Sequence, residues 1–286
     1  MTRRGLILFG VMGLIWGIPY LFIRVAVAEI SPATLVFGRT FIAALILLPI
    51  ALLRTDFRAV LAKWRWVAAF AVAEMAIPWV LLGSAEQHIT SSLAGLLVAG
   101  VPLVATVLAF ATGGLDRIEK SGFAGLVLGI VGVAAIVGTN LGSSSWLALA
   151  AMAFVVAGYA IGPAILARRL GGLSTVAVMA LSLSLCALLY APIAVLQRPA
   201  VLPGVHVLGA VVVLGVVCTA AAFLLFWKLI DEVGPVRSTV VTYLNPAVAA
   251  LLGVAVLGES FTPVMAAGFG LVILGSVLAT RPVASS

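Results

Sequence analysis

The sequence predicts an all-α polytopic membrane protein with ten transmembrane helices arranged as two inverted five-helix repeats. Of its 286 residues, 64% are hydrophobic and 9% are charged. Uncharged apolar stretches recur along the whole chain, and each approaches the roughly 20 residues that a spanning helix needs. The stretches are continuous rather than alternating, which excludes a transmembrane β-barrel.

The ten expected spans leave no room for a separate soluble catalytic domain. We place them at 5–27, 32–53, 66–85, 90–111, 120–138, 146–167, 173–196, 207–229, 235–257 and 262–280. The first follows a basic N-terminus but is too long for the apolar core of a signal peptide, and no clean small-residue cleavage site follows it. We therefore expect it to be retained as a helix.

The distribution of charge predicts the orientation. The net charge is +7, and an N-terminus in the cytoplasm leaves only three of the 16 basic residues, Arg24, Arg39 and Arg198, in the outer half. This asymmetry follows the positive-inside rule, so we expect both termini in the cytoplasm, the loops 140–145 and 197–206 outside, and location in the cytoplasmic (inner) membrane. The basic residues are scattered over several loops, which argues against binding of nucleic acid.

The chain contains an internal repeat. Three pairs align at nearly the same offset: Pro49 with Pro192, Pro102 with Pro246, and Gly13-x-x-x-Gly17 with Gly158-x-x-x-Gly162. We expect repeats at 5–138 and 146–280, and because five helices is an odd number, the second repeat enters the membrane inverted. Inverted repeats are typical of secondary transporters that expose a central site to each side in turn. A channel remains the alternative, although neither a lining charge ring nor a filter loop is evident.

Three segments resemble a known family. They are "LIWGIPYLFIRVAV" in the first span, "FGRTFIAALILL" with Arg39 in the second, and "GPVRSTVVTYLNPAVAALLGVAVLGES" in the ninth. Together with the repeat, they resemble the EamA family of the drug/metabolite transporter superfamily over 10–138 and 150–280. The resemblance implies a ten-helix exporter of amino acids or related small metabolites. One departure is Gly114-Leu115-Asp116 in the first repeat, where the second has Gly258-Glu259.

Five prolines fall near the middles of spans and are expected to break helices around a central cavity: Pro19, Pro78, Pro102, Pro163 and Pro246. A mid-helix proline frees a carbonyl, which the membrane tolerates where neighbours or water satisfy it. The alternative is that these prolines only bend helices for packing.

Glu74 and Arg39 are the charges set deepest in the expected spans. An ionisable residue inside a membrane is a candidate functional residue, and Glu74 could carry a proton, bind a substrate ammonium group or pair with an arginine. Its alternative is a neutral packing element. Arg39 could bind a substrate carboxylate or Glu74, or could extend outward to the interface. If both face one cavity, they would bracket a zwitterion.

Four more polar or aromatic residues are candidate substrate contacts. Trp16 and Tyr20 share a helix face with Arg24, although an interfacial belt also explains Tyr20. Tyr243 and Asn245 precede Pro246, where Asn245 could instead cap the carbonyl that the proline frees.

The remaining motifs argue against an enzyme. The chain has only two histidines and none of the patterns G-x-x-x-x-G-K-[ST], H-E-x-x-H or G-x-S-x-G, so we expect no metal, no cofactor and no catalytic residue. A membrane enzyme acting on lipids is the least favoured alternative. We interpret 86–88 as a solvated outer turn. The expected partners are the lipid bilayer and a small, possibly zwitterionic, substrate.

Overall fold

The computed structural model describes residues 2–113, 120–138, 145–233 and 239–280, and every regular element in these ranges is helical. Most of the expected outer loop 140–145 and the motif at 114–116 lie outside them. The helices are α1 Arg3–Gly17, α2 Pro19–Ala26, α3 Pro32–Arg54, α4 Phe57–Ala62, α5 Trp64–Ala71, α6 Ile77–Glu86, α7 Ser91–Val98, α8 Val101–Ala111, α9 Lys120–Gly138, α10 Trp146–Arg169, α11 Thr175–Leu196, α12 Val205–Gly215, α13 Ala222–Val233, α15 Leu244–Leu257 and α16 Pro263–Ala279.

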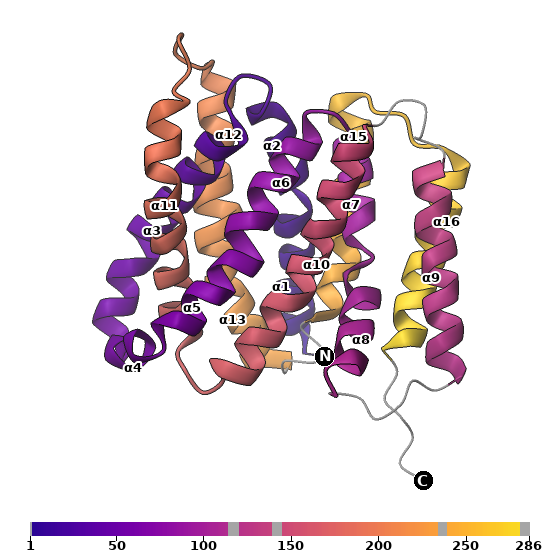
Figure 1. Cartoon of the computed structure of the whole chain (residues 1–286), viewed down its shortest axis with the longest axis horizontal. Helices are drawn as coiled ribbons and strands as arrows, with labels where there is room; N and C mark the ends of the chain where they lie inside the picture. The colour runs from indigo at the N-terminus through magenta and orange to yellow at the C-terminus, as the bar shows by residue number, and fades with distance from the viewer. Residues whose placement is uncertain (1, 114–119, 139–144, 234–238, 281–286) are drawn as a thin grey trace.

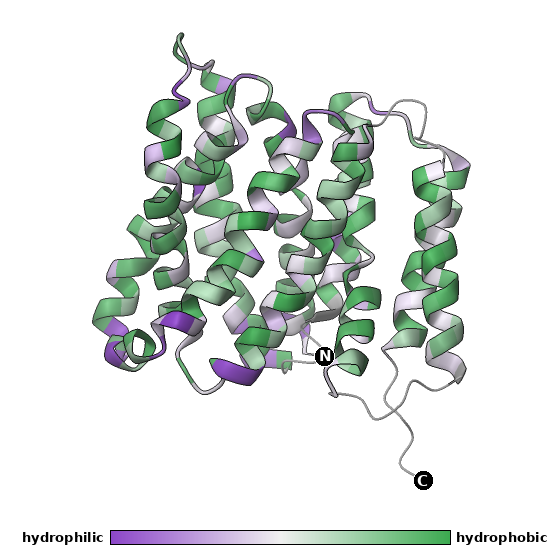
Figure 2. Cartoon of the chain, in the orientation of Figure 1, coloured by the Kyte–Doolittle hydropathy of each residue, from purple (hydrophilic) through white to green (hydrophobic). Residues whose placement is uncertain are grey.

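Eight segments of the described chain are long and apolar enough to cross a membrane, and they match the first eight expected spans to within a few residues. The expected spans 235–257 and 262–280 correspond to shorter apolar helices, Val241–Leu257 and Pro263–Ala279. Figure 2 shows apolar residues along the helices and hydrophilic residues gathered toward their ends. This distribution along the helices is typical of a protein that spans a lipid bilayer.

Hydroxyl side chains start many of these helices. Each accepts a hydrogen bond from a backbone N–H three residues further on, as N-cap residues do: Thr2, Ser31, Thr90, Ser174 and Thr262. At its other end, α15 stops at Gly258, whose φ of 66° is the left-handed cap conformation that glycine adopts at little cost.

Corresponding helices of the two expected repeats pack against each other. Three such pairs are α3 with α11, α7 with α15 and α9 with α16. The contact of α6 with α10 also has its repeat equivalent, which is the contact of α12 with α2. In the α9–α16 pair, which stands at one end of the bundle in Figure 1, the backbones approach closely. A Cβ on Gly125 would lie 2.6 Å from the carbonyl oxygen of Gly275, so these glycines form a packing surface.

The third and eighth spans are each interrupted by a short π-helical segment. These are η1, Val72–Ala76, between α5 and α6, and η2, Val216–Ala221, between α12 and α13. They occupy matching positions in the two halves, and they contain Glu74 and Cys218, which the repeat alignment pairs. Such π-bulges occur frequently at functional sites.

Candidate functional site

A buried arginine holds together a polar cluster among α3, α6 and η2. Arg39 of α3 is 6% exposed, and its Cζ lies 3.6 Å from the centre of the Trp79 ring of α6. Its Nε donates a 3.1 Å hydrogen bond to Thr219 Oγ1 of η2, and that hydroxyl donates to the Leu214 carbonyl. Arg39 is thus fixed inside the bundle, which decides against the interpretation that its side chain extends outward to the interface.

Two tyrosines complete this central polar cluster, defined as Arg39, Trp79, Thr219, Tyr20 and Tyr159. The side chain of Tyr159 of α10 lies near that of Trp79, and both tyrosines lie near the Arg39 guanidinium. Among the described residues, Nε makes the one hydrogen bond of Arg39, so its two terminal NH₂ groups have no protein acceptor there. A guanidinium fork of this kind suits a carboxylate.

Glu74 lies in η1 against the glycine face of α10. Its Oε2 is buried and has no hydrogen-bond partner in the described part of the chain. A Cβ on Gly162 would collide with this carboxylate, so the glycine makes room for it. The structure does not pair Glu74 with Arg39, whose contacts are Trp79 and Thr219. Tyr159 lies within electrostatic range of both charged groups.

The other predicted contacts have different surroundings. The Trp16 ring packs on Phe226 of α13, with centroids 4.7 Å apart, and Tyr243 lies near Thr280, just past the end of α16. Neither contact involves the central polar cluster. Asn245 has a buried Oδ1 without a partner among the described residues. Within the described ranges no hydrogen bond runs from its Nδ2 to the carbonyl that the proline frees.

Four of the five prolines lie at the start of a helix. Pro19 begins α2, Pro78 follows η1 at the start of α6, Pro102 is the second residue of α8, and Pro246 is the third residue of α15. Pro163 is exposed and lies within α10, which continues from Trp146 to Arg169. The expected break at Pro163 is therefore wrong, because α10 accommodates this proline without interruption.

A second polar cluster lies where α6 ends and α7 begins. Glu86 is fully buried, so its interpretation as part of a solvated turn is wrong; α6 continues through it, and only Gln87 and His88 are exposed. The guanidinium of Arg24 donates to the Glu86 carbonyl, and the Glu86 carboxylate has no hydrogen-bond partner among the described residues.

Glu259 closes the N-terminus of α7 from the other half of the chain. Its carboxylate accepts from the backbone N–H groups of Ser91 and Ser92, both at 2.8 Å, and from the Ser92 hydroxyl at 2.6 Å. A carboxylate at a helix N-terminus also interacts favourably with the helix dipole. Glu259 therefore ties the end of α15 to the start of α7.

Three members of the central cluster were not predicted from the sequence: Trp79, Tyr159 and Thr219. Trp79 follows Pro78 and Tyr159 follows Gly158, which the sequence patterns include, whereas Thr219 follows Cys218, which aligns with Glu74 in the repeat. Within the described ranges, no group of His, Cys, Asp or Glu side chains is arranged to hold a metal ion.

Apolar helices, matched pairs from two halves and a buried polar centre define a multi-pass membrane protein. The chain belongs to the EamA-like transporter family, whose model matches it twice, over residues 3–138 and 144–281. A solved structure described only as "Crystal structure of protein" has the same fold, with a TM-score of 0.67, 21% identity, and coverage of 98% of this chain and 97% of that one. A sequence search of curated proteins finds no match.

Proposed function

We propose that this protein is a secondary transporter that exports small organic metabolites, amino acids or related compounds, across the cytoplasmic membrane by alternating access. In this proposal all ten helices cross the membrane, both termini are cytoplasmic, and the repeats 5–138 and 146–280 are inverted. The family membership and the pairing of corresponding helices support it.

The Arg39 guanidinium carries the proposal for the substrate. It is buried and positioned by Trp79 and Thr219, and its terminal NH₂ groups lack protein acceptors among the described residues. An unpaired cation is costly away from water, so a substrate carboxylate bound there would be strongly favoured. The surrounding rings of Tyr20, Trp79 and Tyr159 provide aromatic surfaces for the organic part of the substrate.

Glu74 is proposed as the second charged group of the site. Its unpartnered carboxylate beside α10 can hold a proton or attract the ammonium group of a zwitterion. Asn245, with its unpartnered Oδ1, is proposed as a further polar contact. We also propose that the first turns of α8 and α15, which contain Pro102 and Pro246, line the substrate path, since the repeat alignment pairs these two prolines.

A thermal-shift screen tests the substrate class. Purified protein is heated with amino acids, amines that lack the carboxylate, and carboxylates that lack the amine. We expect a ligand with a carboxylate to raise Tm for the wild type but not for Arg39→Gln. Arg54→Gln, at the exposed end of the same helix, is the matched control and should respond like the wild type. An equal shift in Arg39→Gln would contradict the assignment.

A further inference from the structure

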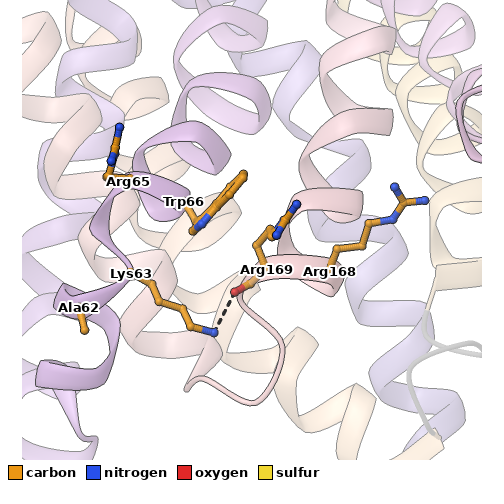
Figure 3. Close-up of a pocket in the computed structure, with 6 residues that line it drawn as sticks. All are labelled: Ala62, Lys63, Arg65, Trp66, Arg168 and Arg169. Carbon is orange, nitrogen blue, oxygen red and sulfur yellow. Dashed lines mark hydrogen bonds between the residues drawn. The ribbon is translucent and has the colours of Figure 1, made fainter. Parts of the chain in front are cut away.

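A pocket rich in positive charge lies where the α4–α5 junction meets the end of α10. It has a volume of about 380 Å³ and is lined by Ala62, Lys63, Arg65, Trp66, Arg168 and Arg169, as Figure 3 shows. Four of these six residues are cationic and none is acidic. We call this site the basic pocket, and its volume falls in the range of about 300–1,000 Å³ typical of small-ligand sites.

The contacts inside the basic pocket position its cations without neutralising them. Lys63 Nζ donates to the Arg169 carbonyl at 3.0 Å, and the Arg169 guanidinium lies 4.5 Å from the centre of the Trp66 ring. Arg168 donates to the Thr112 hydroxyl at 3.1 Å. These partners are all uncharged, and no ion pair in the described part of the chain involves the four cations.

General rules explain part of this arrangement. Arg168 and Arg169 in the last turn of α10 interact favourably with its dipole, and basic residues collect on the cytoplasmic side of membrane proteins. Neither rule explains why Lys63 and Arg65, from another span, line the same pocket as the two arginines of α10. Together the four cations produce an uncompensated concentration of positive charge.

Exposed apolar side chains border the pocket. Trp66 is 41% exposed, and Leu61 and Trp64, which flank the lining residues Ala62 and Lys63 in the chain, are 48% and 57% exposed. Tryptophan is enriched where the membrane meets water. A cationic pocket bordered by tryptophan is typical of the level of lipid headgroups, and the apolar surface beside it suits acyl chains.

We propose that the basic pocket binds a phosphate oxyanion, supplied by the headgroup of an anionic phospholipid in the adjacent leaflet. Arginine forks and a lysine ammonium group are the side chains that bind phosphate most effectively. Basic pockets between transmembrane helices on the cytoplasmic side are known to bind anionic headgroups. The basic pocket contains neither Arg39 nor Glu74, so this proposal does not depend on the proposed transport function.

Native mass spectrometry of the detergent-solubilised protein tests this site. The protein is mixed with phosphatidylglycerol, with phosphatidylcholine or with inorganic phosphate, and the bound fraction is measured. The variant is Lys63→Gln/Arg169→Gln, and Arg54→Gln/Arg58→Gln, exposed on the same side but outside the pocket, is the matched control. Arg168→Gln is a milder variant should the double variant not fold.

We expect the wild type and the control to retain phosphatidylglycerol in preference to phosphatidylcholine. Each cation near an anionic group contributes a factor of about five, so the double variant should bind about 25-fold more weakly and Arg168→Gln about fivefold. If inorganic phosphate binds and its binding weakens by the same factors in the pocket variants, the pocket recognises the phosphate group and a soluble phosphate compound can supply it. Equal retention of both lipids, or equal losses in pocket and control variants, would overturn the proposal.

Discussion

The Arg39 guanidinium lies over the face of the Trp79 ring, 3.6 Å from its centre, and both residues are buried. A desolvated contact of this kind is worth about 2 kcal/mol or more. It joins the second span to the third immediately after η1 and turns the cation toward the middle of the bundle. In the proposed function, this contact sets the position at which the guanidinium would meet a substrate carboxylate.

Replacing the Trp79 ring should weaken substrate binding. Trp79→Leu loses the cation–π contact and should raise Kd on the order of tenfold, whereas Trp79→Phe keeps an aromatic face and should lose less. Titration of the ligand found in the thermal-shift screen measures this. Trp146→Leu, at a 70% exposed position of α10, is the control and should leave Kd unchanged. Identical values for the Leu and Phe variants would contradict a role for the ring.

The close contact of Gly162 with Glu74 predicts a destabilising substitution. Gly162→Ala places a methyl group into the Glu74 carboxylate and should lower the free energy of unfolding by about 1–3 kcal/mol. Gly10→Ala is the control, because a Cβ there has open space and alanine favours helices. Shortening the acid in Gly162→Ala/Glu74→Ala should recover part of the loss. Equal Tm values for Gly162→Ala and the wild type would contradict the packing.

Glu74→Gln separates a proton or cation site from a packing element. The amide keeps the shape but cannot titrate, so the variant should fold normally and lose the pH dependence of transport, measured in proteoliposomes. Because Arg39 contacts Trp79 and Thr219 rather than Glu74, the variants Glu74→Gln and Arg39→Gln should have independent effects on stability. Wild-type transport with an unchanged pH profile would remove Glu74 from the site.

The cap that Glu259 provides for α7 should be important for stability. Glu259→Ala leaves two backbone N–H groups and one hydroxyl without their acceptor, at a cost of about 1–3 kcal/mol. Glu29→Ala is the matched control: this exposed acid pairs with His206 and accepts from the Gly204 N–H at 2.7 Å, and because both contacts lie at the surface its loss should cost no more than about 1 kcal/mol. Denaturant titration of both variants compares them, and equal costs would contradict the assignment.

Most of the fold was predictable because each helix that crosses a bilayer needs about 20 mostly apolar residues. Apolar length alone located the eight long spans, and the spacing of Pro102 and Pro246 indicated two related halves. The π-helical segments were not predictable, because no local pattern distinguishes them from α-helix. Their position depends on packing, such as that of Gly158 and Gly162 against η1.

The site was predictable only in part. Depth in a span identified Arg39 and Glu74 as candidates, but their partners come from other helices, as Trp79 and Thr219 show. Glu86 was misjudged for the same reason: it follows an apolar run as a loop residue would, and only tertiary packing buries it.

Counterflow in proteoliposomes tests the central claim, that Arg39 lies at the substrate site of a carrier, most directly. Vesicles loaded with unlabelled substrate should accumulate labelled substrate, with saturable rates, through the wild type and Arg54→Gln. Arg39→Gln should abolish this exchange while folding normally, and Arg39→Lys should retain a fraction, since a lysine lacks the fork. Non-saturable flux without counterflow, or full exchange through Arg39→Gln, would contradict the account.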